Sequence, residues 1–299
     1  MPRMLSLILS LFISAPALAS TACPDVSGVV QEVIFLDYKD CELAKELADS
    51  FNDMAQTFAV ASQVTLVIGG PMDNASFDNG HIIQVPYRMV FYGDYGTEYP
   101  VPINSLMISA SHEYGHAIFQ EYLKKSLPQF ADLFAAFNAR SDKKLVLLRG
   151  GKDDSLMEDA KRLAETAEYK AFYKLTPYSE FYADVLAVFI HNDKSAMLRA
   201  LYYPQMSPFQ YNYIRMRDFE GEPDPRWSSL MYEEHSKLAY VRSYVGKSMW
   251  PENHAEARTR AGQIVNAILN VVQINLAQGN DPDVQDANNQ LIEELKKTP

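Results

Sequence analysis

The sequence is poor in clustered positive charge and in long apolar runs. Lys and Arg total 27 against 38 Asp and Glu, which gives a formal net charge of -11, and no segment is dense in Lys or Arg. Because nucleic acid and anionic membrane surfaces attract clustered cations, neither is an expected partner. After the first 20 residues, no run is apolar and long enough to span a membrane, so we expect no membrane span after signal cleavage.

Cysteine is also scarce, since only Cys23 and Cys41 occur. In an oxidising compartment they are expected to form a disulfide, which closes a loop of about 18 residues and contributes roughly 3 kcal/mol to stability. A pair committed to a disulfide leaves no thiol for a cysteine switch. Lipid attachment at Cys23 is the alternative, but Ser20-Thr21-Ala22 lacks the large aliphatic residue of a lipoprotein signal.

The first 19 residues have the features of a cleavable signal peptide. Arg3 precedes an apolar run over 4–13, and Ala17-Leu18-Ala19 has the small-x-small pattern that signal peptidase reads. An uncleaved membrane anchor is the alternative, although the run is short for a spanning helix. We therefore expect a secreted or periplasmic protein, with 20–299 forming a single domain.

Hydrophobic periodicity divides this domain into two halves. Up to about residue 125, strand-like runs at 28–38 and 64–70 alternate with amphipathic helical patterns, whereas 126–299 reads almost entirely as helix apart from an irregular stretch at 206–227. The expected fold class is α+β. It has a small mixed sheet, with an edge strand packed on the helix that follows residue 103, and a mainly helical C-terminal half.

The edge strand is expected at Ile83–Tyr92, where apolar and other residues alternate with a period of two. Pro86 lacks a backbone donor, which a sheet tolerates at its edge and hardly anywhere else. Because an edge strand exposes backbone donors and acceptors, an extended peptide could add to it as another strand. An ordinary sheet edge is the alternative.

The stretch "SASHEYGHAIF" at 109–119 carries the chemistry. Asn104 is a good helix N-cap, so the stretch falls within a helix, and His112 and His116 are four residues and about 40 degrees apart on one face. Two imidazoles there can bind one Zn²⁺, and Glu113 lies where a general base can reach a water activated by that ion. Gly115 costs about 1 kcal/mol within a helix relative to Ala, which indicates a close backbone approach.

A catalytic zinc site needs a third protein ligand. Glu121 points to the opposite side of the helix, and Tyr122 occupies the position of the third histidine of metzincins, which excludes that class. In "KLTPYSEFYADVLAVF", Thr176 is a suitable N-cap and Pro177 suits the first turn, so Glu180 and Asp184 fall one turn apart on one side of a helix.

The order of HExxH and a downstream ExxxD resembles the gluzincin zinc metallopeptidases of the thermolysin-like clan. The resemblance covers two short motifs separated by 64 residues (180 minus 116), not the whole chain. It implies Glu180 as the third zinc ligand and Asp184 as the carboxylate that holds His112 by its other ring nitrogen. A solvated acidic face is the alternative for this pair, and Glu165 and Glu168 are fallback ligands.

Many gluzincins add a Tyr or His that stabilises the oxyanion. His235 ranks first here, because it follows the ligand helix, and Tyr178, Tyr182 and Tyr232 are the other candidates. The remaining histidines, His81, His191 and His254, are expected to be surface or packing residues.

The sequence thus predicts a zinc-dependent metallopeptidase that acts on a peptide or protein substrate. A catalytically inactive peptide-binding protein with the same fold, and a zinc amidase acting on cell-wall peptide, are the alternatives.

Overall fold

The computed structural model describes residues 23–70, 74–92 and 97–297. The expected signal peptide at 1–19 lies outside the described residues. Among the described residues, no helix has the length and apolar character needed to cross a membrane.

A small mixed sheet forms the N-terminal part. Its order is β1-β2-β4-β3, with β1, β2 and β4 parallel and β3 antiparallel to β4. A separate antiparallel pair, β5-β6, follows. The strands are β1 (Val30–Phe35), β2 (Val64–Ile68), β3 (Ser76–Phe77), β4 (Ile82–Val85), β5 (Val90–Tyr92) and β6 (Glu98–Pro100).

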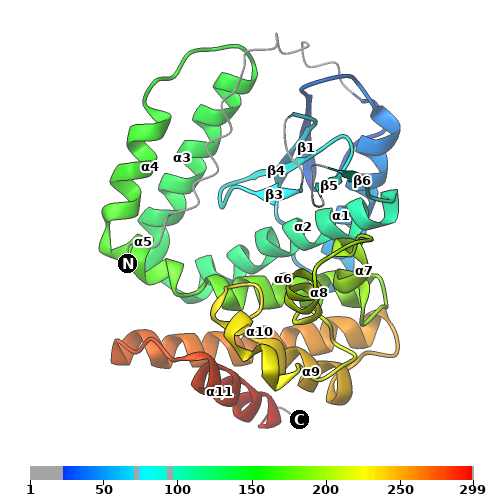
Figure 1. Cartoon of the computed structure of the whole chain (residues 1–299). Coiled ribbons are helices and arrows are strands. Elements are labelled where there is room, and N and C mark those ends of the chain that lie inside the picture. The colour runs from blue at the N-terminus through cyan, green and yellow to red at the C-terminus, as the bar shows by residue number, and fades with distance from the viewer. Residues whose placement is uncertain (1–22, 71–73, 93–96, 298–299) are drawn as a thin grey trace.

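Helices cover the sheet and make up most of the remaining described residues (Figure 1). The helices are α1 (Cys41–Phe58), α2 (Ile103–Ser126), η2 (Pro128–Phe130), α3 (Ala131–Leu148), α4 (Leu156–Glu165), α5 (Ala167–Tyr173), α6 (Thr176–Ile190), α7 (Ala196–Leu201), α8 (Pro208–Arg215), η3 (Pro225–Tyr232), α9 (Ala239–Ser248), α10 (His254–Gln278) and α11 (Val284–Lys296). The expected α+β class is confirmed, and so is the small mixed sheet.

Helix α2 lies between the sheet and the helical half (Figure 1). It contacts β3 and β4 of the sheet, α1 beside it, and α6, α7 and α10 of the helical half. The helices α3, α4 and α5 form an upright arm beside the sheet, and Leu145 and Leu148 at the end of α3 pack against Ile82 of β4. Both faces of the sheet are therefore covered, and all four residues of β4 are buried.

The predicted edge strand at Ile83–Tyr92 is wrong in its bounds and in its place. Strand β4 ends at Val85, before Pro86 can interrupt its ladder, and it lies between β2 and β3. The two edge strands of the sheet are β1 and β3, and a tight turn connects β3 to β4. The Asp78 carboxylate accepts from the N–H groups of Gly80 and Ile82, each at 3.0 Å, and Asn79 takes a φ of 62°. The Asn79-Gly80 pair is a sequence signal for a hairpin turn. The prediction overlooked it because it relied on the alternating pattern at Ile83–Tyr92.

Two predicted helix starts are also wrong, each by one or two residues. Helix α2 begins at Ile103 after Pro102, so Asn104 lies within the first turn and is not the cap. Helix α6 begins at Thr176, after Leu175, and the Thr176 hydroxyl donates to the Tyr173 carbonyl at 2.8 Å. Within the stretch predicted to be irregular, α8 forms behind a capping box at Ser207.

The predicted disulfide between Cys23 and Cys41 is present. It connects the segment before β1 to the first residue of α1. The bond uses the thiol on which lipid attachment at Cys23 would depend. A disulfide fits an extracytoplasmic location, because oxidising compartments preserve such bonds.

Candidate metal centre

The site depends on a close crossing of α2 and α6. At Gly115 an added Cβ atom would lie 2.8 Å from the Cα atom of Ala183 and 3.1 Å from its carbonyl oxygen. Only a glycine therefore allows the two helices to pack this closely, as the sequence indicated. Gly115 lies between His112 and His116, and Ala183 lies between Glu180 and Asp184. The crossing point thus brings the two motifs face to face.

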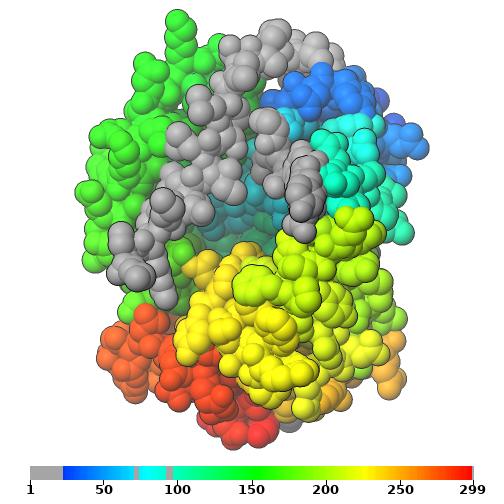
Figure 2. Space-filling view, viewed as in Figure 1, coloured from blue at the N-terminus to red at the C-terminus, as the bar shows by residue number. Residues whose placement is uncertain are grey.

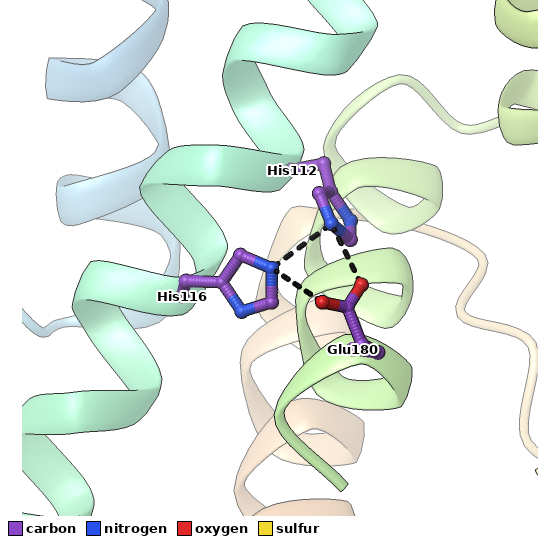
Figure 3. Close-up of side chains that lie close together, drawn as sticks. All are labelled: His112, His116 and Glu180. Carbon is purple, nitrogen blue, oxygen red and sulfur yellow. Dashed lines mark hydrogen bonds and ion pairs between the residues drawn. The ribbon is translucent and has the colours of Figure 1, made fainter. Parts of the chain in front are cut away.

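Three side chains converge on one point at this crossing (Figure 3). The Nε2 atoms of His112 and His116 are 3.0 Å apart. The Glu180 carboxylate lies 3.2 Å from His112 Nε2 through Oε2 and 3.5 Å from His116 Nε2 through Oε1. These ligand atoms all lie within 4.8 Å of one another, and the group could hold a metal ion.

The spacing fits a single small ion. In a tetrahedral site with bonds of about 2.0–2.1 Å, the ligand atoms are roughly 3.3–3.4 Å apart, close to the distances observed here. Glu180 is 8% exposed, and its Oε2 accepts no hydrogen bond within the described part of the chain. A buried carboxylate oxygen without a donor is costly unless a cation compensates it. The residues present therefore fit a divalent metal.

Asp184 holds His112 from behind. Its Oδ1 lies 2.9 Å from His112 Nδ1, so this ring nitrogen donates to the carboxylate and Nε2 is left for a metal. Two buried arginines contact the same carboxylate: Arg217 Nε donates to Oδ2 at 3.2 Å, and Arg242 Nε donates to Oδ2 at 2.9 Å. Burial alone would raise the pKa of Asp184, but Arg217 and Arg242 hold it well below its usual value.

His116 has a different partner. Its Nδ1 lies 2.8 Å from the hydroxyl of Ser179, the residue before Glu180. Burial, together with the neighbouring His112, lowers the pKa of His116 to about 3, so its ring is neutral and can bind a metal. Burial and Arg217 would lower the pKa of His112 too, but the adjacent carboxylates of Asp184 and Glu180 outweigh them and raise it to about 9. His112 is thus protonated at neutral pH in the metal-free protein.

Glu113 faces the edge strand. Its Oε2 accepts from the backbone N–H of Phe77 in β3 at 2.7 Å. Burial raises the pKa of Glu113 to about 7, assisted by the charge of Glu180 and opposed by His112 and the Phe77 hydrogen bond. The edge strand that contacts the HExxH helix is therefore β3. The contact is made by the Glu113 carboxylate of the helix, which accepts from the Phe77 N–H of the strand.

His235 reaches the centre from the segment after η3. Its Nε2 lies 3.4 Å from Glu180 Oε2, and its Nδ1 lies 2.7 Å from the Glu233 carboxylate. The Tyr213 hydroxyl is 3.3 Å from the same Nδ1. Glu233 thereby fixes the ring with Nε2 directed at the cluster. The structure brings His235, the first-ranked oxyanion candidate, to the centre.

The other candidates lie elsewhere. Tyr178 and Tyr182 are buried away from the cavity at the centre, Tyr232 is 73% exposed, and the fallback ligands Glu165 and Glu168 are exposed. Of the other histidines, His81 lies 3.6 Å from Asp142, His191 contacts Ser111 at 3.2 Å, and His254 is exposed at the start of α10.

An open cavity of about 340 Å³ surrounds the cluster. Figure 2 shows the hollow in this face, between the green helices of the arm and the yellow and yellow-green segments below them. Ser76 and Phe77 of β3, Glu113, Arg217 and His235 line it together with the three clustered side chains. A ligand in the cavity therefore meets the point on which His112, His116 and Glu180 converge, the edge strand β3 and the guanidinium of Arg217.

Sequence reasoning missed Arg217, Arg242, Glu233, Tyr213 and Ser179. Arg217 and Arg242 lie 33 and 58 residues from Asp184, with no motif around them. Two of the others had a local signal, since Glu233 precedes His235 by two residues and Ser179 precedes Glu180 directly.

Comparison of the chain with known protein families, with curated proteins and with solved structures gives no match in any of the three.

Proposed function

We propose that this protein is a zinc-dependent metallopeptidase with a zincin-like fold of the gluzincin type, exported to the periplasm or the cell exterior. One observation carries the proposal: His112, His116 and Glu180 converge at metal-ligand spacing in a cavity that also contains Glu113 and an edge strand. Imidazole and carboxylate ligands with an open face suit Zn²⁺.

His112, His116 and Glu180 would hold the ion, and Asp184 and Ser179 would orient the two imidazoles. A bound Zn²⁺ would supply Lewis-acid activation of a water molecule, whose pKa it lowers to about 7. This reaction requires a general base beside the water and a donor for the departing amine.

Glu113 suits both proton transfers. Its carboxylate lies in the cavity one residue after His112, and burial raises its pKa to about 7, so it can take a proton from the water and pass it on near neutral pH. His235, held by Glu233, would donate from Nε2 to the oxyanion that forms at the scissile carbonyl. The backbone of β3 would align the peptide as an added strand.

The test compares zinc-loaded wild type with Glu113→Gln and with Glu121→Gln. Glu121 is on the same helix, pairs with Lys124 at 2.8 Å and does not line the cavity, so it is a matched control. Each protein is incubated with a broad peptide library that includes cell-wall peptide fragments, and products are identified by mass spectrometry. We expect cleavage by wild type and Glu121→Gln, and a loss of about 10²–10⁴-fold in Glu113→Gln with zinc retained.

Three other outcomes would contradict the peptidase proposal or the role of Glu113. If wild type holds one zinc per chain and leaves every peptide intact, the protein is a non-catalytic binder. If only cell-wall fragments are cleaved, it is the amidase of the alternative reading. Equal cleavage by Glu113→Gln would remove Glu113 from the mechanism.

A further inference from the structure

The arm of α3, α4 and α5 contacts the turn that follows the edge strand β3. The Ser141 hydroxyl of α3 donates to Asp78 Oδ2 at 2.7 Å, and its oxygen accepts from the backbone N–H of His81 at 3.4 Å. The next residue of α3, Asp142, lies 3.6 Å from His81 Nε2 through Oδ1. Ser141 is 1% exposed, so water does not compete for its hydroxyl. Two consecutive residues of the arm thus bind this turn.

The arm and the turn pack without room for a side chain between them. A Cβ atom added at Gly80 would collide with Ser141 Oγ and would lie 2.9 Å from the carbonyl oxygen of Phe137. The N–H groups of Gly80 and Ile82 both donate to Asp78 Oδ1, each at 3.0 Å. The two oxygens of one carboxylate therefore close the turn between β3 and β4 and connect it to the arm.

Strand β3 has few other attachments. It consists of Ser76 and Phe77, which pair with β4. On its outer side the Phe77 N–H donates to Glu113 Oε2 of α2 at 2.7 Å. Among the described residues, the Asp78–Ser141 bond is the other side-chain hydrogen bond that connects residues 76–78 to a helix. The position of this strand therefore depends on one contact with α2 and one with the arm.

The contact with α2 is not compatible with the proposed reaction. A general base must direct its carboxylate to the water, so Glu113 has to leave the Phe77 N–H. A peptide that adds to β3 also needs this outward-facing N–H for its own carbonyl. Once Glu113 has moved, the Asp78–Ser141 bond is the remaining attachment of the two. Because a displacement of about 1 Å can cost roughly 10²-fold in rate, this attachment matters for the alignment of a substrate.

We propose that Ser141 and Asp78 are positioning residues, through which the arm holds β3 where its backbone can align a peptide beside the metal centre. This inference rests on the proposed peptidase function and identifies what sets the alignment of the substrate at that site. The arm lies between α2, which carries two of the clustered side chains, and α6, which carries the third. One segment thus connects both of these helices to the strand.

The first experiment measures backbone amide hydrogen exchange by NMR and requires neither metal nor turnover. Ser141→Ala is compared with Ser155→Ala, a matched control whose hydroxyl makes its hydrogen bonds within the arm and does not line the cavity. We expect the amides of Phe77, Gly80 and Ile82 to exchange about 10-fold faster in Ser141→Ala, relative to the amides of β2, and at wild-type rates in Ser155→Ala. Unchanged rates in Ser141→Ala, or an equal rise in both variants, would overturn the proposal.

The second experiment compares a short and an extended metal-binding ligand. Zinc-loaded protein is titrated with acetohydroxamate, which reaches only the cluster, and with a hydroxamate that carries a trialanine extension able to pair with β3. We expect the extended compound to bind at least about 10-fold more tightly to wild type and to Ser155→Ala. Ser141→Ala should lose most of this difference and retain its zinc. Equal affinities for wild type, no binding of either compound, or an undiminished difference in Ser141→Ala would refute the role of the arm.

A second variant disturbs the same contact from the side of the turn. Gly80→Ala introduces a Cβ that collides with Ser141 Oγ, whereas Gly262→Ala, in α10, introduces one that meets no atom within 4 Å. Gly80→Ala should reduce the difference between the two hydroxamates as Ser141→Ala does, and Gly262→Ala should keep it. If Gly80→Ala keeps the full difference, the packing of the arm on the turn does not position β3.

The peptide library separates the two proposals. Cleavage by Ser141→Ala at wild-type rates would leave the peptidase standing and refute the role of the arm. Faster exchange and a lost difference in hydroxamate affinity in Ser141→Ala, without cleavage of any peptide by wild type, would support the role of the arm and refute the peptidase.

Discussion

The substitution Gly115→Ala tests whether the crossing of α2 and α6 positions the ligands of the proposed metal centre. A Cβ at this position would lie 2.8 Å from Ala183 Cα, whereas ordinary contact begins near 3.4 Å. The helices must therefore separate by 0.6 Å (3.4 minus 2.8) or distort. Metal sites require ligand distances within about 0.2 Å of their preferred values, so the movement of Glu180 and Asp184 away from the histidines exceeds what the site tolerates.

Two opposing terms determine the effect on stability. Ala is a better helix former than Gly by about 1 kcal/mol, whereas overpacking a core costs about 1–3 kcal/mol. We expect a free energy of unfolding lower than that of wild type by up to about 2 kcal/mol, and zinc affinity weaker by about 10–100-fold. Urea unfolding and competition with a chromophoric chelator measure the two quantities.

Gly262 provides the control. It lies inside α10, and an added Cβ there would meet no atom within 4 Å. Gly262→Ala should therefore raise stability by about 1 kcal/mol and leave zinc affinity unchanged. If Gly115→Ala behaves like Gly262→Ala, the close crossing is not what positions the ligands, and the reasoning fails.

Three further predictions follow from the buried charges and the disulfide. Asp184→Asn leaves two buried arginines without their counterion and should lower the free energy of unfolding by about 3–5 kcal/mol; a loss below 1 kcal/mol in urea titration would contradict this. Because the pKa of His112 is raised to about 9, zinc uptake at pH 7 should release about one proton, and the apparent zinc affinity should fall as pH falls from 9. Calorimetry in buffers of different ionisation enthalpy measures the proton release. Zinc uptake without proton release would refute this prediction. Replacing Cys23 and Cys41 by Ser should cost about 3 kcal/mol with zinc affinity unchanged, because neither lines the cavity; an unchanged urea midpoint would show that the disulfide contributes little.

Tertiary packing changed the sequence-based account of the sheet and of the helix starts. The alternation at Ile83–Tyr92 predicted a half-buried edge strand, but covering by α1 and α2 on one side and the end of α3 on the other buries β4 completely. The edge strand beside β4 is β3, whose two residues are too few to show a period in the sequence. A strand of this length is defined by its partner and by the turn at Asn79, not by its own pattern.

Features that depend only on local helix geometry could be predicted from the sequence. The four-residue spacings place His112 beside His116 and Glu180 beside Asp184 wherever those helices lie, because a turn of helix fixes neighbouring azimuths. Gly115 predicted a close approach of another backbone, and two cysteines in a chain expected to be exported predicted a disulfide. The packing of the helices, by contrast, brings Glu180 to the histidines and leaves Glu165 and Glu168 exposed. It also places Arg217 and Arg242 against Asp184. Those contacts join segments tens of residues apart, and their distances depend on how the helices pack, which no local spacing encodes.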